Sequence, residues 1–554
     1  MEWLRNKRRQ RRAGVYKTAD LESISERRTR WRSVRVTYFT MFLMTLGFSI
    51  VLTGIWPYLD TLDPDAGKSF LGFVVAANPL AQMIVSPLFG YWANKIGSVR
   101  APLITSVALF TISSVTYSLL ELFPSSTVKY WMLATRFFVG ASSANIAVIR
   151  SYLSSATTVR ERTGAVSMMS LAQVLGFICG PAIQTAVAPL GDEGIGLFGG
   201  KIHLNMYTAT GWVNVLLGAI NCLCFMPFCF TEMPISAKEA QRRQGAATAE
   251  ETWLGTKPDY MATWSLILAF FILSFNFVLL ETLGQPLVMD QFAWTKEQAV
   301  MNMGLLMTAG AVIALVTFAA IKPLTKKFDE RCLLLWGGFM LMVVGRISHI
   351  PWGDAPPVIK TKGAVQTWAS LFAHHFNLNL CFTEMVMNQL NSNLTEVVGC
   401  PVDEQPWCAF TPAMTMTQLL LGYFLTSIGY PIGITVIQTL FSKILGPRPQ
   451  GVWQGLLTGS GCLSRVLGPI FLSYVYVNLG VVWTFSLTTV MMAVCCVWMG
   501  LVYKRLTPPQ LTSTPVPLTS DVSKLPRTIV IGKASGASRA NTKDGSNEER
   551  QTLQ

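Results

Sequence analysis

Charged side chains are scarce in this sequence. Asp, Glu, Lys and Arg make up 13% of the 554 residues, whereas soluble domains carry roughly 25%. The hydrophobic fraction is 51% and the mean hydropathy is positive. This balance excludes an ordinary soluble enzyme or binding domain, and it favours a chain that lies largely within a lipid bilayer.

The residue clusters that build metal and catalytic centres are also missing from the sequence. There are four His, and none of the 11 Cys forms a Cys-x-x-Cys pair, so a zinc site is not expected. No loop combines a nucleophile with a base in a recognisable spacing. We therefore expect no enzymatic activity, no cofactor and no metal.

Long apolar runs fill most of the chain. A transmembrane helix needs about 20 apolar residues. The runs predict an all-α membrane protein with twelve transmembrane helices, at 36–59, 69–92, 101–123, 129–153, 165–189, 208–230, 263–285, 299–321, 332–350, 414–440, 452–476 and 480–503. The first run is too long for a cleavable signal peptide and is expected to remain as an anchor.

Basic residues set the expected orientation. The net charge is +14, and much of the excess lies in segments 5–12 and 27–35, just before the first run. Alternate connections between the runs are also rich in Lys and Arg. Because positively charged loops remain in the cytosol, both termini are predicted to be cytosolic. The charge is thereby explained, and a nucleic-acid partner is not expected.

Two long connections give the expected organisation. It comprises a basic cytosolic tail (1–35), an N-terminal six-helix bundle (36–230), a cytosolic linker (231–262), a C-terminal six-helix bundle (263–503) and a cytosolic tail (504–554). The last segment is rich in Ser, Thr, Pro and Lys and is predicted to be disordered. The connection 351–413 should face the lumen.

The luminal connection carries two expected modifications. Asn393, in the sequence Asn-Leu-Thr, is a candidate N-glycosylation site. Cys400 and Cys408 are a candidate disulfide in an oxidising lumen. Cys381 lies in the same connection, so the pairing stays open at this stage.

A glycine-rich loop follows the second predicted span. Gly90, Asn94, Lys95, Gly97 and Arg100 follow the spacing G-x3-N-K-x-G-x2-R. This spacing resembles the loop signature of the major facilitator superfamily, and the resemblance implies two six-helix bundles around a central path that this loop closes on the cytosolic side. Asn94 stands where the signature has an acid, so a hydrogen-bonded latch is expected in place of a charge relay. A degenerate copy at 322–331 supports an internal repeat.

Glycine and proline recur together in the fifth and eleventh spans. Gly176, Gly180 and Pro181 lie in the fifth, and Gly468 and Pro469 in the eleventh. The first group resembles a motif of antiporters in the same superfamily, which implies bent helices at the interface where the bundles rock. A plain packing kink is the alternative.

Few charges lie inside the predicted spans. Arg136 begins a segment, Arg-Phe-Phe-Val-Gly, that resembles the arginine motif of the superfamily, which implies a side chain that faces the translocation path. Its alternative is an anchor between helices. Arg465 lies in the eleventh span. Arg346 is nearer a span end and is expected to reach the interface, and Arg150 is interpreted as interfacial.

Glu281 is the acid nearest the centre of any predicted span. A carboxyl in this position is a candidate for proton coupling. A salt bridge with Arg465 or Arg136 is the alternative. Since the arginines outnumber this acid, the cavity charge favours an anionic solute, and Arg136, Glu281 and Arg465 are the candidate pathway residues.

Five unusual segments narrow the resemblance: 30–35, 55–59, 293–300, 442–451 and 502–506. They are similar to an endolysosomal branch of the superfamily, over about residues 30 to 506. This resemblance implies a lysosomal and late endosomal membrane location, and chloride permeation that affects luminal pH and ion balance. The first 35 residues contain no acidic dileucine sorting signal.

Three functions remain open at this stage. The first is an anion pathway, with chloride as the expected small-anion partner. The second is a proton-coupled exchanger of a small organic solute, based on Glu281 and the glycine–proline segment. The third is a membrane scaffold or receptor that no longer transports.

Overall fold

A computed structural model describes residues 21–52, 54–191, 194–197, 202–244, 258–353, 356–358, 399–402 and 405–508. Asn393 and Cys381 lie outside the described residues, as do the first 20 residues and segment 509–554. The predictions of glycosylation and of a disordered C-terminal tail are therefore not addressed by the structure.

Helices account for nearly all of the first half of the chain. These are α2 (Ile24–Leu52), α3 (Ile55–Leu62), α4 (Gly67–Ile96), α5 (Arg100–Ser118), α6 (Ser125–Ser142), α7 (Asn145–Ser155), α8 (Arg162–Val187) and α9 (Thr208–Cys224). A short antiparallel hairpin of β1 (Ile195–Leu197) and β2 (Ile202–Leu204) connects α8 to α9, with Ile195 opposite Leu204. We call α2–α9 the N-half.

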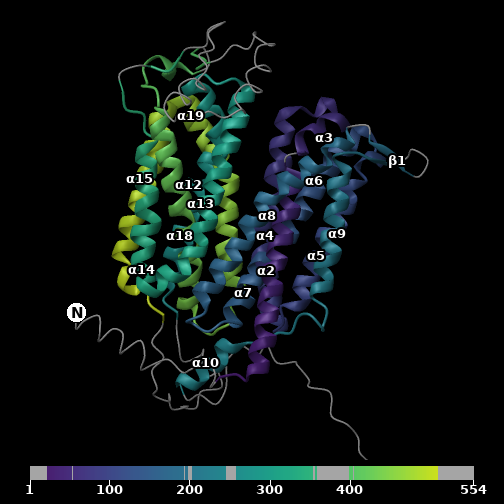
Figure 1. Cartoon of the computed structure of the whole chain (residues 1–554), viewed down its shortest axis with the longest axis vertical. Coiled ribbons are helices and arrows are strands. Elements are labelled where there is room, and N and C mark those ends of the chain that lie inside the picture. Colours follow the sequence, from purple (N-terminus) through teal and green to yellow (C-terminus); the bar gives the residue numbers. More distant parts are fainter. Residues whose placement is uncertain are drawn as a thin grey trace, which may run out of the picture. The chain divides into compact units, whose positions relative to one another are not determined.

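The second half begins after a short polar helix, α10 (Ile235–Gln244). It comprises α12 (Tyr260–Phe292), α13 (Lys296–Lys327), α14 (Glu330–Cys332), the π-helical segment η5 (Leu333–Met340), α15 (Leu341–Ser348), the 3-10 turn η7 (Pro406–Ala409), α18 (Met416–Leu445), α19 (Gly451–Leu501) and the 3-10 turn η8 (Tyr503–Arg505). We call α12–α19 the C-half. Figure 1 shows the N-half in purple and blue and the C-half in teal, green and yellow.

Among the described residues, ten helices are long and apolar enough to cross a membrane. This set has two members fewer than the twelve predicted spans. The sixth corresponds to α9, which has 17 residues. The eleventh and twelfth are merged in α19, which has 51 residues and a break at Gly480, where φ is +89°.

The break at Gly480 turns α19 back on itself. Its first residue, Gly451, lies against Asn94 at the inner end of the molecule, and Tyr503, just after its last residue, contacts Arg331. Gly480 lies at the opposite end, where a Cβ would be 2.8 Å from the Trp407 ring. A positive φ is easily adopted only by glycine, so Gly480 permits a helical hairpin whose arms match predicted spans 452–476 and 480–503.

Two helices of the C-half begin with side chains that cap their first turn. Thr295 and Gln298 form a capping box at the start of α13, and Thr415 and Gln418 form another at the start of α18. Each box satisfies two backbone N–H groups that the first turn leaves free. Prolines lie inside several helices, where neighbouring helices compensate for the lost hydrogen bonds: Pro79, Pro87, Pro181, Pro286, Pro323, Pro431 and Pro469.

The first helix begins at Ile24, before the start of the span predicted from residue 36. Arg30 belongs to this helix and is 1% exposed. Its guanidinium pairs with Glu22 at 2.7 Å and Glu161 at 3.1 Å, and it donates to the carbonyl of Ala156. Glu22 precedes α2, whereas Ala156 and Glu161 lie in the α7–α8 connection. These polar partners hold the part of the helix that precedes the apolar run, which hydropathy alone did not reveal.

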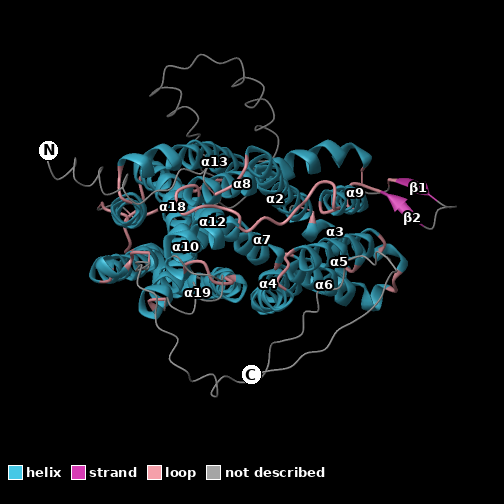
Figure 2. Cartoon of the chain, turned by 90° about the horizontal axis from the view of Figure 1, so that it is seen from below, coloured by secondary structure: helices cyan, strands magenta, loops and turns pink. Residues whose placement is uncertain are grey.

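The two halves meet at one end of the molecule. We call it the inner end, defined by Asn94, Glu330 and Lys443, and we call the opposite end, defined by Trp407, the outer end. Hydrogen bonds join the halves at the inner end, for example from the backbone N–H of Gly451 to Asn94 Oδ1 and from Lys443 to Thr163. Figure 1 shows α7 and α10 towards this end, and Figure 2 shows α7 between the halves when viewed from below.

Candidate functional site

Glu281 and Arg465 face the space between the halves. Glu281 comes from α12 and Arg465 from the first arm of α19, and both side chains are exposed. The electrostatic neighbours of Arg465 include Glu281, Tyr430 of α18 and Arg150 of α7. Because these neighbours belong to three other helices and to both halves, the guanidinium points towards the pathway and not towards lipid.

The pair is close but not in direct contact. Among the described residues no ion pair within 4.0 Å joins Glu281 to an arginine, so the predicted alternative of a salt bridge with Arg465 or Arg136 is not formed in this conformation. Phe277 and Tyr430 stack with ring centroids 4.0 Å apart, and they form an aromatic wall beside the two charges. The site therefore offers an accessible cation, an accessible carboxylate and a flat apolar surface.

Arg150 lies deeper than the sequence interpretation placed it. It is 9% exposed, between the halves, and its Nη1 donates to Thr458 Oγ1 at 3.1 Å. Its guanidinium also lies 6.0 Å from the ring centroid of Phe270. The assignment as an interfacial residue is therefore wrong, because α7 turns this face towards α19, a partner more than 300 residues away in the chain.

Nearer the inner end, a charged cluster holds the halves together. Lys443 of α18 pairs with Glu330 at 2.6 Å. Thr163 of α8 donates to the same carboxylate at 2.5 Å, and Arg162 donates to the carbonyl of Ser442 at 3.1 Å. We call these four side chains the inner clasp, and they close this end of the pathway.

The predicted gating loop lies beside the clasp. Asn94 Oδ1 accepts a hydrogen bond from the backbone N–H of Gly451 at 3.0 Å, at the first residue of α19. A Cβ on Gly90 would lie 2.1 Å from the carbonyl oxygen of Gly451. Two glycines thus let α4 and α19 cross in backbone contact, and an amide joins them where the superfamily signature has an acid.

The rest of the loop shapes its own half. Gly97 ends α4 with φ of +70°. Arg100 Nε donates to the carbonyl of Phe225, just beyond the end of α9, at 2.9 Å. The backbone N–H of Arg100 donates to Glu232 at 3.0 Å. Lys95 is exposed. Arg100 therefore satisfies a backbone carbonyl at the C-terminal end of α9.

Arg136 is not brought together with Arg465 and Glu281. It is 3% exposed and lies within the N-half, 5.7 Å from the ring centroid of Phe48. The surrounding cavity is lined by residues of the N-half alone: Gly47, Val51, Phe110, Ser114, Tyr117, Thr135, Val139 and Asn214. The structure therefore brings Glu281 and Arg465 near each other and places Arg136 apart from them, within the N-half.

Arg346 is fully buried, which the sequence interpretation did not foresee. Its exposure is 0%, and its guanidinium donates to the carbonyl of Asn276. Nε and Nη1 have no hydrogen-bond partner. The expectation that it reaches the membrane interface is wrong, because α15 turns this side chain towards α12. The sequence did contain a signal for this burial, because the predicted span 332–350 has an arginine but no acid that could pair with it.

The glycine–proline segments occupy close helix contacts. A Cβ on Gly176 would lie 2.5 Å from the carbonyl oxygen of Phe42, and one on Gly180 would lie 2.5 Å from Ser49, so α8 packs closely on α2. Pro181 follows within α8. In α19, a Cβ on Gly468 would lie 3.0 Å from the side chain of Val278, and Pro469 follows this glycine. These contacts lie within each half.

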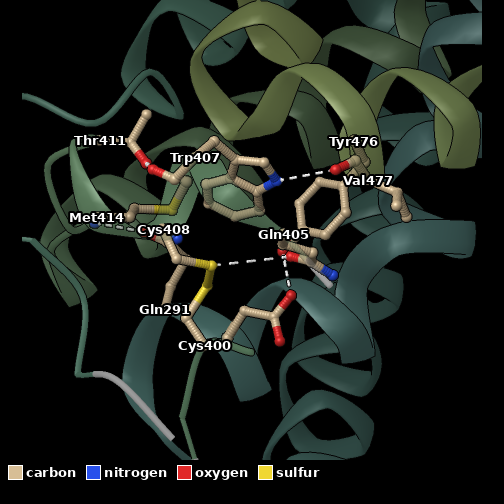
Figure 3. The surroundings of a disulfide bond; sticks show 10 residues. Gln291, Cys400, Gln405, Trp407, Cys408, Thr411, Met414, Tyr476 and Val477 are labelled. Carbon is tan, nitrogen blue, oxygen red and sulfur yellow. Dashed lines mark hydrogen bonds between the residues drawn. A yellow bond between two sulfur atoms is a disulfide. The ribbon is translucent and has the colours of Figure 1, made fainter. Parts of the chain in front are cut away.

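A disulfide joins Cys400 and Cys408 at the outer end. Figure 3 shows Trp407 beside this bond, with its indole directed towards Tyr476 and Val477. Trp407 Nε1 donates to the carbonyl of Val477 at 3.2 Å, and Tyr476 donates to Asp290 at 2.7 Å. The first bond fixes the described part of the outer connection to α19, and the second joins α19 to α12. The backbone N–H of Met414 also donates to Gln291 of α12 at 2.9 Å.

The family model of the major facilitator superfamily matches residues 37–373 and 406–534. The chain belongs to the major facilitator superfamily. A Xenopus laevis protein named major facilitator superfamily domain-containing protein 8 is 39% identical over 492 residues, which cover 88% of this chain and 94% of that protein. Multidrug resistance protein 1 of Bacillus subtilis is 25% identical over half of this chain and 62% of its own length.

Solved structures agree on the fold. The human organic anion transporter MFSD10 matches with a TM-score of 0.58 at 15% identity, over 85% of this chain and 99% of that one. The proton:xylose symporter XylE matches with a TM-score of 0.59 at 14% identity, over 86% and 96% of the two chains. The chain is therefore a multi-pass membrane transporter of the superfamily, and superfamily members move small solutes rather than catalyse reactions.

Proposed function

We propose that this chain forms an anion pathway, with chloride as the main solute, through the space between its halves. The observation that carries the proposal is Arg465, an exposed cation in the middle of a membrane helix. Among the described residues, no carboxylate forms a direct ion pair with this side chain, although Glu281 lies nearby. An intramembrane arginine is costly unless it is hydrated or paired. Arg465 therefore supplies a place where a passing anion is stabilised.

The architecture of the proposal has twelve spans and cytosolic termini. Counting α9 and both arms of α19 gives this number, and the inner end carries the basic loops that should face the cytosol. The similarity in residues 30–506 supports a lysosomal and late endosomal membrane, where chloride flow would contribute to ion and pH balance. Arg136 is retained as a secondary pathway residue of the N-half.

The test uses the full chain in the membrane of enlarged endolysosomes. Currents are recorded while chloride is replaced by a large impermeant anion. We expect a current whose reversal potential follows the chloride gradient, and a clear loss of conductance in Arg465→Gln with retention in Arg465→Lys. Arg505→Gln is the matched control, because Arg505 is exposed outside the spans, where it faces Asp259 at 3.7 Å. Wild-type protein present in the membrane without such a current would overturn the proposal.

A second candidate is a proton-coupled exchanger of a small organic solute. The observation that favours it is Glu281, which is exposed beside Arg465 and the stacked Phe277 and Tyr430. A carboxyl that takes up a proton when the solute leaves Arg465 would couple the two movements. This candidate predicts electrically silent uptake that follows a pH gradient.

A further inference from the structure

A second cavity lies between the halves, closer to the inner end than Arg465. Its lining comprises Arg150 and Ser154 of α7, Val166 of α8, Gln438 and Ser442 of α18, and Gln454 of α19. All six residues are less than a tenth exposed. Both halves contribute side chains, so the cavity is complete only while the inner end is closed.

The lining has hydrogen-bonding capacity that the protein leaves unused. Arg150 Nε and Ser442 Oγ have no partner, although both are buried. The amide oxygen of Gln438 is also without a partner, and rotation of this amide exchanges its oxygen for its NH2 group. Buried polar atoms are almost always hydrogen-bonded, so the cavity is built for a ligand that accepts from these groups.

One lining atom remains an acceptor. Gln454 donates its amide N–H to Gln450 Oε1 at 3.2 Å. Its own oxygen therefore stays on the cavity side, without a partner. The Ser154 hydroxyl already donates to the carbonyl of Ser151 at 2.7 Å. The remaining polar groups are the Arg150 guanidinium, the Ser442 hydroxyl and the rotatable Gln438 amide, so donors predominate among them.

The charge of the lining distinguishes an anion from a neutral ligand. Arg150 donates a hydrogen bond to the neutral hydroxyl of Thr458. The charged group among the electrostatic neighbours of Arg150 is another arginine, Arg465. No carboxylate within the described part of the chain pairs with Arg150. An uncompensated buried charge is strongly unfavourable. A water molecule can hydrogen-bond the guanidinium, but only an anion also neutralises its charge.

We propose that this cavity is a second anion site, which holds one monatomic anion such as chloride against Arg150 and Ser442 while the inner end is closed. The cavity has room for a ligand of about one heavy atom. A chloride ion is slightly wider than a water molecule and needs a small shift of the rotatable Gln438 amide, whereas carboxylates and sulfate do not fit. The proposal rests on the anion pathway proposed above: an anion that leaves Arg465 towards the inner end meets Arg150 next. Occupancy stabilises the closed inner end, because the site exists only there.

The test measures the unfolding temperature of the purified full chain in detergent. Sodium chloride, bromide, gluconate and sulfate are compared at matched ionic strength. A ligand that binds only the folded, closed protein raises the unfolding temperature. We expect chloride and bromide to raise it and gluconate and sulfate to leave it unchanged. Arg150→Gln and Ser442→Ala should each lose most of the shift, and Arg505→Gln should keep it.

Chloride flux in liposomes, measured on the same preparations, separates the two proposals. A chloride shift that persists in both Arg150→Gln and Ser442→Ala, or that gluconate reproduces, overturns the second site even when the wild-type flux is normal. A second outcome is that both variants lose the chloride-induced rise in unfolding temperature while the wild type shows no chloride flux. This outcome overturns the proposed pathway but supports an anion site in the cavity. If Arg150→Gln does not fold, Arg150→Lys, which keeps the charge and should keep part of the shift, replaces it beside Ser442→Ala.

Discussion

At the scale of single residues, the buried arginines set the character of this protein. Arg136, Arg150 and Arg346 are each at least nine-tenths buried, and among the described residues none forms an ion pair with a carboxylate. Each is held instead by neutral groups, such as the Thr458 hydroxyl and the Asn276 carbonyl. Such an arrangement keeps the interior positive, which suits an anionic solute.

Glu281 is the residue that distinguishes the two candidate functions. We expect Glu281→Gln to raise anion conductance modestly in a passive pathway, because a negative charge beside Arg465 is removed. A coupled exchanger should instead lose its dependence on a pH gradient, because glutamine cannot take up a proton. Solute uptake and current, each recorded with and without a pH gradient, decide between them.

The control for this substitution is Glu281→Asp, which retains the carboxyl. Pathway currents that are unchanged in Glu281→Gln would show that this carboxyl does not shape the field at Arg465. Uptake that still follows the pH gradient in Glu281→Gln would remove it as the coupling group.

At the scale of elements, the crossing of α4 and α19 is the contact most sensitive to small changes. Gly90 and Gly451 bring two backbones together without side chains between them. Asn94 then ties α4 to the N-terminus of α19 through one hydrogen bond. Since a helix N-terminus favours negative charge, this position is suited to an acid, yet the chain uses a neutral amide.

Substitutions at Asn94 should shift the closure of the inner end. In Asn94→Ala the lost hydrogen bond, worth about 1 kcal/mol, should increase the open population about fivefold. Asn94→Asp should decrease it, because a charged acceptor at a helix N-terminus is stronger. The measurement is the rate at which a membrane-impermeant maleimide modifies Ser167→Cys, a buried position where the halves meet.

Tyr91→Phe is the control for this experiment, since Tyr91 is an exposed residue of the same helix. Labelling of the chain without Ser167→Cys is subtracted to remove the contribution of the native cysteines. Equal labelling rates in Asn94→Ala, Asn94→Asp and wild type would show that this hydrogen bond does not govern closure.

At the scale of the whole molecule, one covalent bond secures the outer end. The disulfide between Cys400 and Cys408 closes a short loop, and Trp407 from this loop packs on the Gly480 turn. Loss of a disulfide over so short a loop should cost roughly 2 to 3 kcal/mol of unfolding free energy. We expect Cys400→Ser with Cys408→Ser to lower the unfolding temperature measurably.

The control is Cys496→Ser, which removes a free cysteine from α19. A reducing agent should lower the unfolding temperature of the wild type and leave that of the double variant unchanged. An unfolding temperature that is equal in the wild type and the double variant would contradict a stabilising role for this bond.

Much of the architecture was predictable because hydropathy is a property of consecutive residues. The linker predicted at 231–262 separates α9, which ends at Cys224, from α12, which begins at Tyr260. The positions of Arg150 and Arg346 were not predictable in this way. Position along a helix does not show which face meets a partner, and the partner of Asn94 is 357 residues away. The start of α2 was missed because polar contacts, not apolar ones, extend it.

The anchoring of Trp407 has a mechanical consequence. Trp407 and the Gly480 turn both belong to the second half of the chain, whereas the β1–β2 hairpin belongs to the first. If the halves rock, the anchored part of the outer connection moves together with the C-half alone. An antibody fragment that binds only this anchored segment would move with the C-half and leave the motion free. A fragment that also binds the β1–β2 hairpin would join the two halves and hinder the motion.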